Sequence, residues 1–274
     1  MMKKLYLEPI GGLGNRMRSI ASCLWAAEVT NSKLIIVWNQ NSEFNSRIEN
    51  HFLESDKFEI VSYKSKYKYL KNNIQKNLIK KAVIFLINKT LGFDFFMTDP
   101  HFKNQEQKIL DLIRRNKKVY FKTYEEFGES FLHYSIFEPN FKLSFKINNF
   151  IGQHFNKNVI GIHIRRTDNE MSIINSPLES FIELLDQEKR NNPQVRFFLA
   201  TDDKLVENKL IEKYGSSMIV RQKVLSRETV QGIEDAIIDL WCLSKTELIY
   251  GSYWSTFSIA ATRIGNPKLI VVKR

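Results

Sequence analysis

The sequence predicts an α/β protein with two Rossmann-like halves, each built around a parallel sheet, over residues 1–145 and 146–274. Two observations carry this prediction. The first forty residues follow the order strand, glycine-rich turn, helix, strand, which is a βαβ unit. From about residue 145 onward, apolar runs of strand length alternate with segments of helical periodicity, as in doubly wound sheets. With 274 residues, 43% of them apolar, the chain can bury a substantial core.

The first βαβ unit begins with a short strand, Leu5–Leu7, and the turn Gly11–Asn15 follows it. A helix is predicted next, because apolar residues then recur at helical spacing. They are Ile20, Cys23, Leu24 and Ala27. Leu34–Trp38 is a continuous apolar run of strand length, and it completes the unit.

The second half predicts alternating strands and helices up to the end of the chain. The predicted strands are Val159–Ile164, Arg196–Ala200, Met218–Val220, Leu248–Tyr250 and Leu269–Val272. The predicted helices are Pro177–Arg190, Lys204–Tyr214, Gly232–Ser244 and Thr256–Ile264. Strands and helices at this spacing indicate a parallel sheet, whose ligands bind at the carboxyl ends of the strands.

The net charge of +11 favours anionic partners, although a basic solvated surface accounts for it equally well. Residues 61–93 hold eight lysines and no acidic residue, with apolar residues at helical spacing beside them. Such a helix over Lys64–Lys89 can make peripheral contact with an anionic membrane. It can also be the exposed face of an ordinary helix, and the sequence leaves both interpretations open.

Targeting and redox signals predict a soluble cytoplasmic protein, free or peripheral at the inner membrane face. No secretory signal is visible, and the longest apolar run, Ala82–Ile87, is too short to span a bilayer. Cys23 and Cys242 lie in apolar segments without metal-binding spacing, so they are expected to be core residues in a reducing compartment.

The strongest chemical signal is Gly161–Asp168, where a buried strand runs directly into Arg165, Arg166, Thr167 and Asp168. Two guanidinium groups match the oxygens of a diphosphate and neutralise its charge. The alternative is a surface ion pair between Arg166 and Asp168. His163, between two isoleucines on the same strand, is by itself more typical of a core histidine than of a ligand group.

Two later segments also place polar residues at strand ends. Phe198–Asp203 ends in Asp202 and Asp203, either of which could simply cap the following helix. Tyr253–Ser258 brings hydroxyl groups to a helix start, where free amide groups can bind an anion or the hydroxyls can act as plain caps. Asp235 and Asp239 share one face of the preceding helix.

The turn Gly11–Arg16 allows a ligand to approach the backbone closely, although a lone glycine cluster is a weak signal. Arg16 and Arg18 lie at the start of the following helix, where the helix dipole disfavours positive charge. An anion between the glycine turn and these arginines would account for them. The sequence contains neither an Asp-x-Asp pair nor a P-loop.

Together these segments resemble the superfamily of GDP-fucose-dependent fucosyltransferases, most closely its α1,6 branch. The resemblance rests on His163–Asp168, Phe198–Asp203, Asp239–Ser244, Tyr253–Ser258 and Gly12–Arg16. It is specific from about residue 158 onward, and between about 40 and 145 no similarity is recognised. It implies a GT-B-like fold, with two Rossmann-like domains facing each other across a cleft. The donor would bind residues 146–274, and the acceptor would bind residues 1–145.

The resemblance also implies inverting transfer with no metal and no cofactor beyond the GDP-fucose donor. Arg165 would contact the β-phosphate, Arg166 would support it, and His163 and Asp239 would help to recognise the guanine nucleotide. The remaining donor-binding residues would be Gly12, Gly14, Asn15, Arg16, Asp168, Asp202, Ser255, Thr256 and Ser258.

The chain departs from the α1,6 branch after the Arg-Arg-Thr-Asp segment. That branch has a lysine and, a few residues later, a catalytic glutamate, where this chain has Asn169 and Ile173. Glu170 is the nearest carboxylate and is the candidate base toward the acceptor hydroxyl. The departure favours a different acceptor, a different linkage or weak activity.

The predicted function is transfer of fucose from GDP-fucose to a hydroxyl of a bacterial surface glycan or oligosaccharide precursor, which could be lipid-linked. The alternative is a non-catalytic protein that binds GDP, a nucleotide sugar or a glycan on the same fold. A nucleic-acid partner is not expected, because no nucleic-acid motif occurs and the basic stretch lacks the aromatic spacing of stacking platforms.

Overall fold

The computed structural model describes residues 2–62, 92–98, 102, 105–167 and 169–274, which form two compact units. The first unit comprises Met1–Glu49 and Leu53–Glu138, and the second comprises Asn50–Phe52 and Pro139–Arg274. The predicted basic helix over Lys64–Lys89 and the predicted site residue Asp168 lie outside the described residues.

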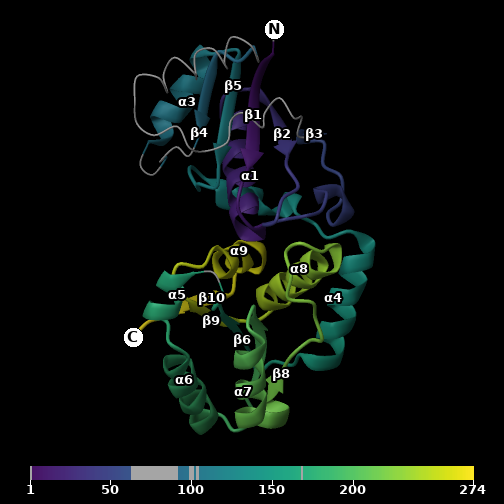
Figure 1. Ribbon diagram of the computed structural model, residues 1–274, viewed down its shortest axis with the longest axis vertical. Helices are drawn as coiled ribbons and strands as arrows, with labels where there is room; N and C mark the ends of the chain where they lie inside the picture. Colours follow the sequence, from purple (N-terminus) through teal and green to yellow (C-terminus); the bar gives the residue numbers. More distant parts are fainter. Residues whose placement is uncertain (1, 63–91, 99–101, 103–104, 168) are drawn as a thin grey trace. The chain divides into compact units, whose positions relative to one another are not determined.

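In the described part of the first unit, five parallel strands form one sheet in the order β3-β2-β1-β5-β4 (Figure 1). Its strands are β1 (Lys3–Pro9), β2 (Ser32–Trp38), β3 (Phe58–Ser62), β4 (Phe95–Thr98) and β5 (Lys118–Thr123). Its helices are α1 (Leu13–Val29) and α3 (Glu106–Arg115), and the short helices η1 (Ile48–Asn50) and η3 (Ser130–Ile136) lie in the connections.

The second unit holds another five-stranded parallel sheet, in the order β10-β9-β6-β7-β8. Its strands are β6 (Val159–Ile164), β7 (Arg196–Thr201), β8 (Met218–Ile219), β9 (Leu248–Ser252) and β10 (Lys268–Val272). Its helices are α4 (Phe141–His154), α5 (Glu170–Asn175), α6 (Leu178–Asn191), α7 (Lys204–Tyr214), η4 (Gly215–Ser217), α8 (Val230–Ser244) and α9 (Thr256–Gly265).

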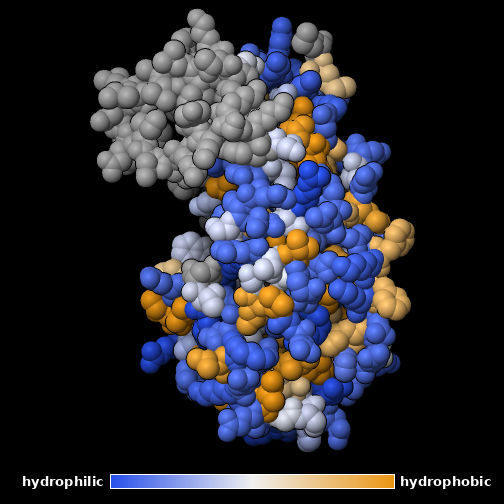
Figure 2. Space-filling view, turned by 45° about the vertical axis from the view of Figure 1, so that its right-hand side comes forward, coloured by the Kyte–Doolittle hydropathy of each residue, from blue (hydrophilic) through white to orange (hydrophobic). Residues whose placement is uncertain are grey.

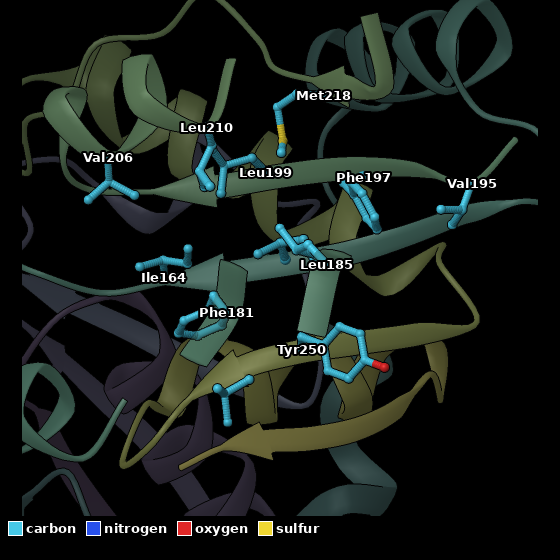
Figure 3. Packing of buried hydrophobic residues seen from close by; sticks show 12 residues of the cluster. Ile164, Phe181, Leu185, Val195, Phe197, Leu199, Val206, Leu210, Met218 and Tyr250 are labelled. Atoms are coloured by element: carbon cyan, nitrogen blue, oxygen red, sulfur yellow. The ribbon is translucent and has the colours of Figure 1, made fainter. Parts of the chain in front are cut away.

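The two faces of the sheet in the second unit carry different side chains of β6. Ile162 and Ile164 of β6 are fully buried in one hydrophobic cluster together with side chains of α6 and α7 (Figure 3). The helical members of this cluster are Phe181, Leu185, Val206 and Leu210. Because side chains alternate along a strand, His163 points to the opposite face, where Phe257 of α9 stacks on its ring at 4.9 Å. The alternation therefore turns one polar side chain of β6 away from the hydrophobic cluster.

In each sheet, the first strand of the unit lies in the middle. From β6 the chain moves outward to β7 and β8, and then returns to the other side of β6 for β9 and β10. The strand order therefore reverses between β6 and β9, and between β1 and β5 in the first unit. In open parallel sheets, ligands bind at the carboxyl ends of the strands at this reversal. Arg165 and Arg166 directly follow the end of β6.

The predicted fold class, two α/β units with parallel sheets, is confirmed. The predicted strands and helices of residues 159–272 are confirmed with small shifts at their ends, whereas β3, β4, α3, β5, α4 and α5 were not predicted. Helix α4 spans the predicted boundary at residue 145, yet it lies wholly in the second unit. None of the described helices is long and apolar enough to cross a membrane. On the face shown in Figure 2, hydrophobic side chains are scattered among hydrophilic ones.

Candidate functional site

The loop that follows β6 is fixed by the strands on either side of it. The backbone N–H of Arg165 donates to Ser252 Oγ at the end of β9, at 3.1 Å. The backbone N–H of Arg166 donates to Asp202 Oδ1, which follows β7, at 2.8 Å. Since β9 and β7 flank β6 in the sheet, these two bonds hold the arginine pair at the reversal of strand order.

Asp202 and Asp203 have separate tasks. Asp202 also accepts from the hydroxyl of Thr167 at 2.7 Å, so its carboxylate holds the arginine loop from two consecutive residues. Asp203 caps α7 by accepting from the backbone N–H groups of Leu205 and Val206. The capping alternative for this pair therefore applies to Asp203, and the predicted donor residue Asp202 is a positioning residue for the loop.

The Arg166 side chain points back into its own unit. Its Nη2 donates to the carbonyl of Ser176 at 2.6 Å, at the end of α5. Burial lowers the pKa of Arg166, while the carboxylates of Glu179, Asp202 and Asp203 oppose that shift. This guanidinium ties the arginine loop to α5, which makes Arg166 a positioning residue. That Arg165 contacts a phosphate stays a prediction from the sequence motif.

His163 is buried on the face of the sheet that carries α9. Its Nδ1 shares a 2.7 Å hydrogen bond with Ser258 Oγ, another predicted donor residue. A Cβ on Gly251, the neighbour of His163 on β9, would lie 2.7 Å from Ser258 Oγ, so glycine leaves room for this bond. Burial lowers the pKa of His163 from 6.5 to about 4, and the charges of Asp202 and Arg165 act in opposite directions on it.

The low pKa of His163 predicts a loss of stability in acid. Between pH 6.5 and about 4 the unfolded chain binds a proton that the folded ring does not, so the free energy of unfolding falls as the pH is lowered. The loss should reach about 3 kcal/mol, and it should be absent above pH 6.5. Denaturant unfolding at several pH values checks this, with His163→Asn as the comparison. His51, whose pKa burial also lowers to about 4, titrates in both proteins. Identical pH slopes for the two would contradict the prediction.

Helix α9 begins without a side-chain cap. Ser255 occupies the N-cap position, its side chain makes no capping bond, and its Oγ is buried without a hydrogen-bond partner. The first backbone N–H groups of any helix lack intrahelical acceptors, and the helix dipole adds positive potential there. Thr256, the first residue of α9, supplies a second hydroxyl. Ser252, three residues before Ser255, holds the arginine loop, so this helix start and that loop share one connection.

Asp239 lies in a buried ion cluster that the sequence analysis did not foresee. Its two carboxylate oxygens pair with Arg221 Nε at 2.9 Å and Lys223 Nζ at 2.7 Å. Asp235, one turn earlier on α8, pairs with Arg221 Nη2 at 3.0 Å. Burial lowers the pKa of Arg221, but the two carboxylates outweigh it and raise that pKa above its ordinary value. Both carboxylate oxygens of Asp239 are therefore already engaged by cations of its own unit.

The same cluster fixes the segment between β8 and α8. The backbone N–H of Val224 donates to Asp235 Oδ2 at 3.0 Å, and Lys223 Nζ lies 3.4 Å from the carbonyl of Leu199 on β7. The ion pairs of Arg221 and Lys223 were not predicted, because no feature of the sequence around these two residues indicates that they pair with carboxylates of α8. The available signal was that two carboxylates on the inner face of an apolar helix require cationic partners.

Glu170, the candidate base, is the exposed first residue of α5. Asn169, which stands where the α1,6 branch has a lysine, caps this helix by accepting from the backbone N–H of Ser172 at 3.0 Å. Its side-chain amide also donates to the carbonyl of Trp254, at 3.1 Å. Ile173 is exposed and has no charged group to offer.

The predicted donor residues of the glycine turn lie at the strand reversal of the first unit. Gly12 is the N-cap of α1, Gly14 is buried in its first turn, and the half-buried Asn15 packs against Gly11. Gly11 has a φ of 83°, which favours glycine, and a Cβ there would lie 2.6 Å from Asn15 Nδ2. The turn is therefore close-packed on its own helix.

Arg16 is buried inside the first unit, with 1% of its surface exposed. Its guanidinium donates to the carbonyls of Gly11 and Asn39 and lies 4.6 Å from the Trp38 ring centre. Burial lowers its pKa to about 10. The expectation that Arg16 faces an anion is not matched by this geometry, in which the side chain holds the glycine turn against the loop after β2.

A buried polar group that the sequence analysis missed lies at the same strand reversal. Glu8 of β1 is fully buried, and it pairs with Lys122 Nζ of β5 at 3.1 Å. It also accepts from the Tyr120 hydroxyl at 2.7 Å and the Asn39 amide at 3.3 Å. Polar residues that alternate with apolar ones at the end of a buried strand could have indicated this buried group. These bonds fix the carboxyl edge of the first sheet beside the glycine turn.

The described residues contain no group of three or more His, Cys, Asp or Glu side chains that could hold a metal ion.

Comparison with known proteins gives matches only among solved structures. No family model matches the sequence, and the search of curated proteins gives no match. NodZ α1,6-fucosyltransferase soaked with GDP-fucose is similar with a TM-score of 0.66 at 16% identity, over 96% of this chain and 92% of that one. A mutant of Arabidopsis thaliana FUT1 in complex with GDP gives 0.68 at 15%, over 100% and 71%. POFUT1 in complex with GDP gives 0.60 at 11%, over 98% and 97%. At these identities the likeness establishes the fold.

Proposed function

We propose that this chain is a GDP-fucose-dependent fucosyltransferase whose donor binds the second unit. The solved structures that share its fold include complexes with GDP and with GDP-fucose. The sequence motifs and the strand reversal at β6 and β9 independently support the same location for the donor.

One observation carries the proposal: the uncapped start of α9 beside the arginine loop. A buried hydroxyl without a partner is costly unless a ligand completes its hydrogen bonding. Free helix N–H groups, Ser255 and Arg165 together provide donors and positive potential of the kind that a diphosphate requires. The bond between Ser252 and Arg165 joins the two parts of this site.

The mechanism we propose is a single displacement that inverts the sugar carbon. The acceptor oxygen forms a bond to C1 of fucose, while the bond from C1 to the β-phosphate oxygen breaks and its electron pair leaves with GDP. The acceptor proton passes to Glu170. Negative charge grows on the departing diphosphate, so fixed donors around it lower the barrier. Arg165 and the start of α9 perform this task without a metal ion.

Replacing Ser255 by alanine should weaken GDP binding about tenfold, because one hydrogen bond to a charged oxygen is lost. The fold should not suffer, since Ser255 makes no capping bond in the free protein. Isothermal titration of GDP measures the effect, and Ser216→Ala, at an exposed serine of the same unit, is the control. Equal GDP affinity in both variants would place the phosphates elsewhere.

Turnover is the test of the proposed reaction. The protein is incubated with GDP-fucose and a mixture of oligosaccharides in EDTA, and both GDP release and fucosylated product are measured. Product formation from GDP-fucose, and not from GDP-mannose or UDP-galactose, is the expected result. Product that appears only after Mg²⁺ or Mn²⁺ is added would contradict metal independence.

The acceptor we propose is a hydroxyl of a bacterial surface glycan or oligosaccharide precursor, used in the cytoplasm. A lipid-linked precursor would suit a basic stretch such as Lys64–Lys89. Flotation of the protein with vesicles containing anionic lipid tests that part. Protein that stays in the soluble fraction would contradict the proposed contact with a membrane.

A second candidate function is non-catalytic binding of GDP or a GDP-sugar. Ile173 favours it, because an isoleucine stands where the resembling enzymes carry their catalytic glutamate. This candidate predicts GDP binding without hydrolysis or transfer.

The base of the proposed reaction has its own test. A Glu170→Gln variant that turns over as fast as the wild type would show that Glu170 is not the base.

A further inference from the structure

Trp254 is a large aromatic side chain displayed to solvent beside the candidate donor site. Its relative exposure is 66%, and it lies between Tyr253 and the N-cap residue Ser255. Its backbone has a φ of 53°, in the left-handed region that a bulky residue rarely adopts. Residues held in such conformations cluster at functional sites, where the surrounding structure imposes them.

Two anchors fix the backbone around Trp254. Before it, the N–H of Tyr253 donates to Ser176 Oγ at 2.7 Å, and that hydroxyl donates to the carbonyl of Val272 at 2.5 Å. At Trp254 itself, the carbonyl accepts from the Asn169 side chain at 3.1 Å. The indole is therefore presented from a preorganised backbone, which lowers the entropy cost of binding to it.

These anchors also place Trp254 between two parts of the proposed reaction centre. The next residue, Ser255, belongs to the start of α9, where the donor diphosphate would bind. The Asn169 that holds its carbonyl immediately precedes Glu170, the candidate base. If Glu170 is the base, the acceptor hydroxyl has to come close to it, and Trp254 is attached to the backbone that Asn169 holds beside Glu170.

We propose that Trp254 is a stacking platform that the second unit contributes to the acceptor sugar, in addition to the acceptor side that the resemblance assigns to residues 1–145, and that Asn169 is its positioning residue. This inference rests on the proposed function. A pyranose ring carries hydroxyl groups at its rim and C–H groups on its faces, so an indole can cover one face while the hydroxyls remain available. Aromatic walls with a few fixed polar groups are typical of such small-molecule sites.

The test separates donor binding from acceptor binding. Wild type, Trp254→Ala, Trp254→Phe and Asn169→Ala are each titrated with GDP. Each GDP-loaded protein is then examined by saturation-transfer NMR with methyl β-galactoside, methyl β-glucoside and methyl β-N-acetylglucosaminide. Leu205→Ala, at a leucine of α7 with 79% exposure, is the matched control for loss of an exposed apolar side chain.

The expected result is that GDP affinity stays within about twofold in all variants, while Trp254→Ala lowers sugar affinity about tenfold. Trp254→Phe should recover part of that loss, and Asn169→Ala should show an intermediate one. In transfer assays the acceptor KM should rise in Trp254→Ala while the GDP-fucose KM does not, which a merely structural residue would not produce.

Three outcomes would overturn the inference while leaving the donor site intact. They are sugar binding that is unchanged in Trp254→Ala, absence of binding by every glycoside to GDP-loaded wild type, and a rise in the GDP-fucose KM alone. The last outcome would assign Trp254 to the donor sugar. Failure of wild type to bind GDP would instead refute the proposed function itself.

Discussion

Replacing Arg165 by alanine should lower kcat/KM for fucosyl transfer by about 10²–10³-fold, the effect of removing one donor to the charge that develops in a transition state. Its backbone is fixed by Ser252 at the reversal of strand order, and the neighbouring Arg166 is engaged with the carbonyl of Ser176. Initial rates with GDP-fucose measure the effect, and titration of GDP shows how much of it is ground-state binding.

The Arg165 experiment has two comparisons. Arg165→Lys should recover only part of the activity, because an ammonium group cannot make the paired, planar contacts of a guanidinium group with a diphosphate. Arg190→Ala removes an equal charge from an exposed position in the last turn of α6 and should leave the rate unchanged. An Arg165→Ala enzyme as active as Arg190→Ala would show that the arginine loop is structural.

Replacing Asp239 by alanine should lower the free energy of unfolding by about 3–5 kcal/mol, the range for breaking a buried ion pair. The change leaves Lys223, whose side chain is 4% exposed, without its 2.7 Å partner, and removes one partner of Arg221. Urea unfolding measures the loss. If Asp239 served mainly to bind the nucleotide, the variant would instead keep its stability and lose GDP affinity.

Glu59→Ala is the matched control for Asp239. Glu59 pairs with Lys33 at 2.7 Å, but both side chains are about half exposed. Exposed pairs contribute about 0.2–1 kcal/mol, so this variant should lose less than about 1 kcal/mol. Losses of similar size in the two variants would contradict a special role for the buried cluster.

The sequence predicted the second unit well because its signals are local. Apolar runs such as Val159–Ile164 identify buried strands, and the residues that follow each run lie at one edge of a parallel sheet. That rule alone predicts that Arg165, Asp202 and the start of α9 lie at the same edge. The structure adds the bonds from Ser252 and Asp202 that hold the loop.

The contacts between distant segments could not be predicted. Asp202 and Asp203 are adjacent, yet Asp202 holds the arginine loop and Asp203 caps α7. This difference depends on where the arginine loop lies. Arg16 looked like a ligand group from its position at a helix start, yet Trp38 of β2 and Asn39 of the following loop contact its guanidinium. These contacts depend on which loops lie side by side in the folded chain, and a local sequence pattern does not predict that.

The middle of the chain was missed for a different reason. Strand β4 has only four residues, too few for a periodicity to be recognised. Helix α3 did carry a usable signal, since Ile109, Leu110 and Ile113 recur at helical spacing and are buried.

The measurement that tests the central claim most directly is isothermal titration of the wild-type protein with GDP in the presence of EDTA, with UDP as the competitor nucleotide. One GDP should bind per chain, with an affinity that the chelator does not change, and UDP should bind much more weakly. Absence of GDP binding, or equal binding of both nucleotides, would contradict a GDP-sugar site at the end of β6.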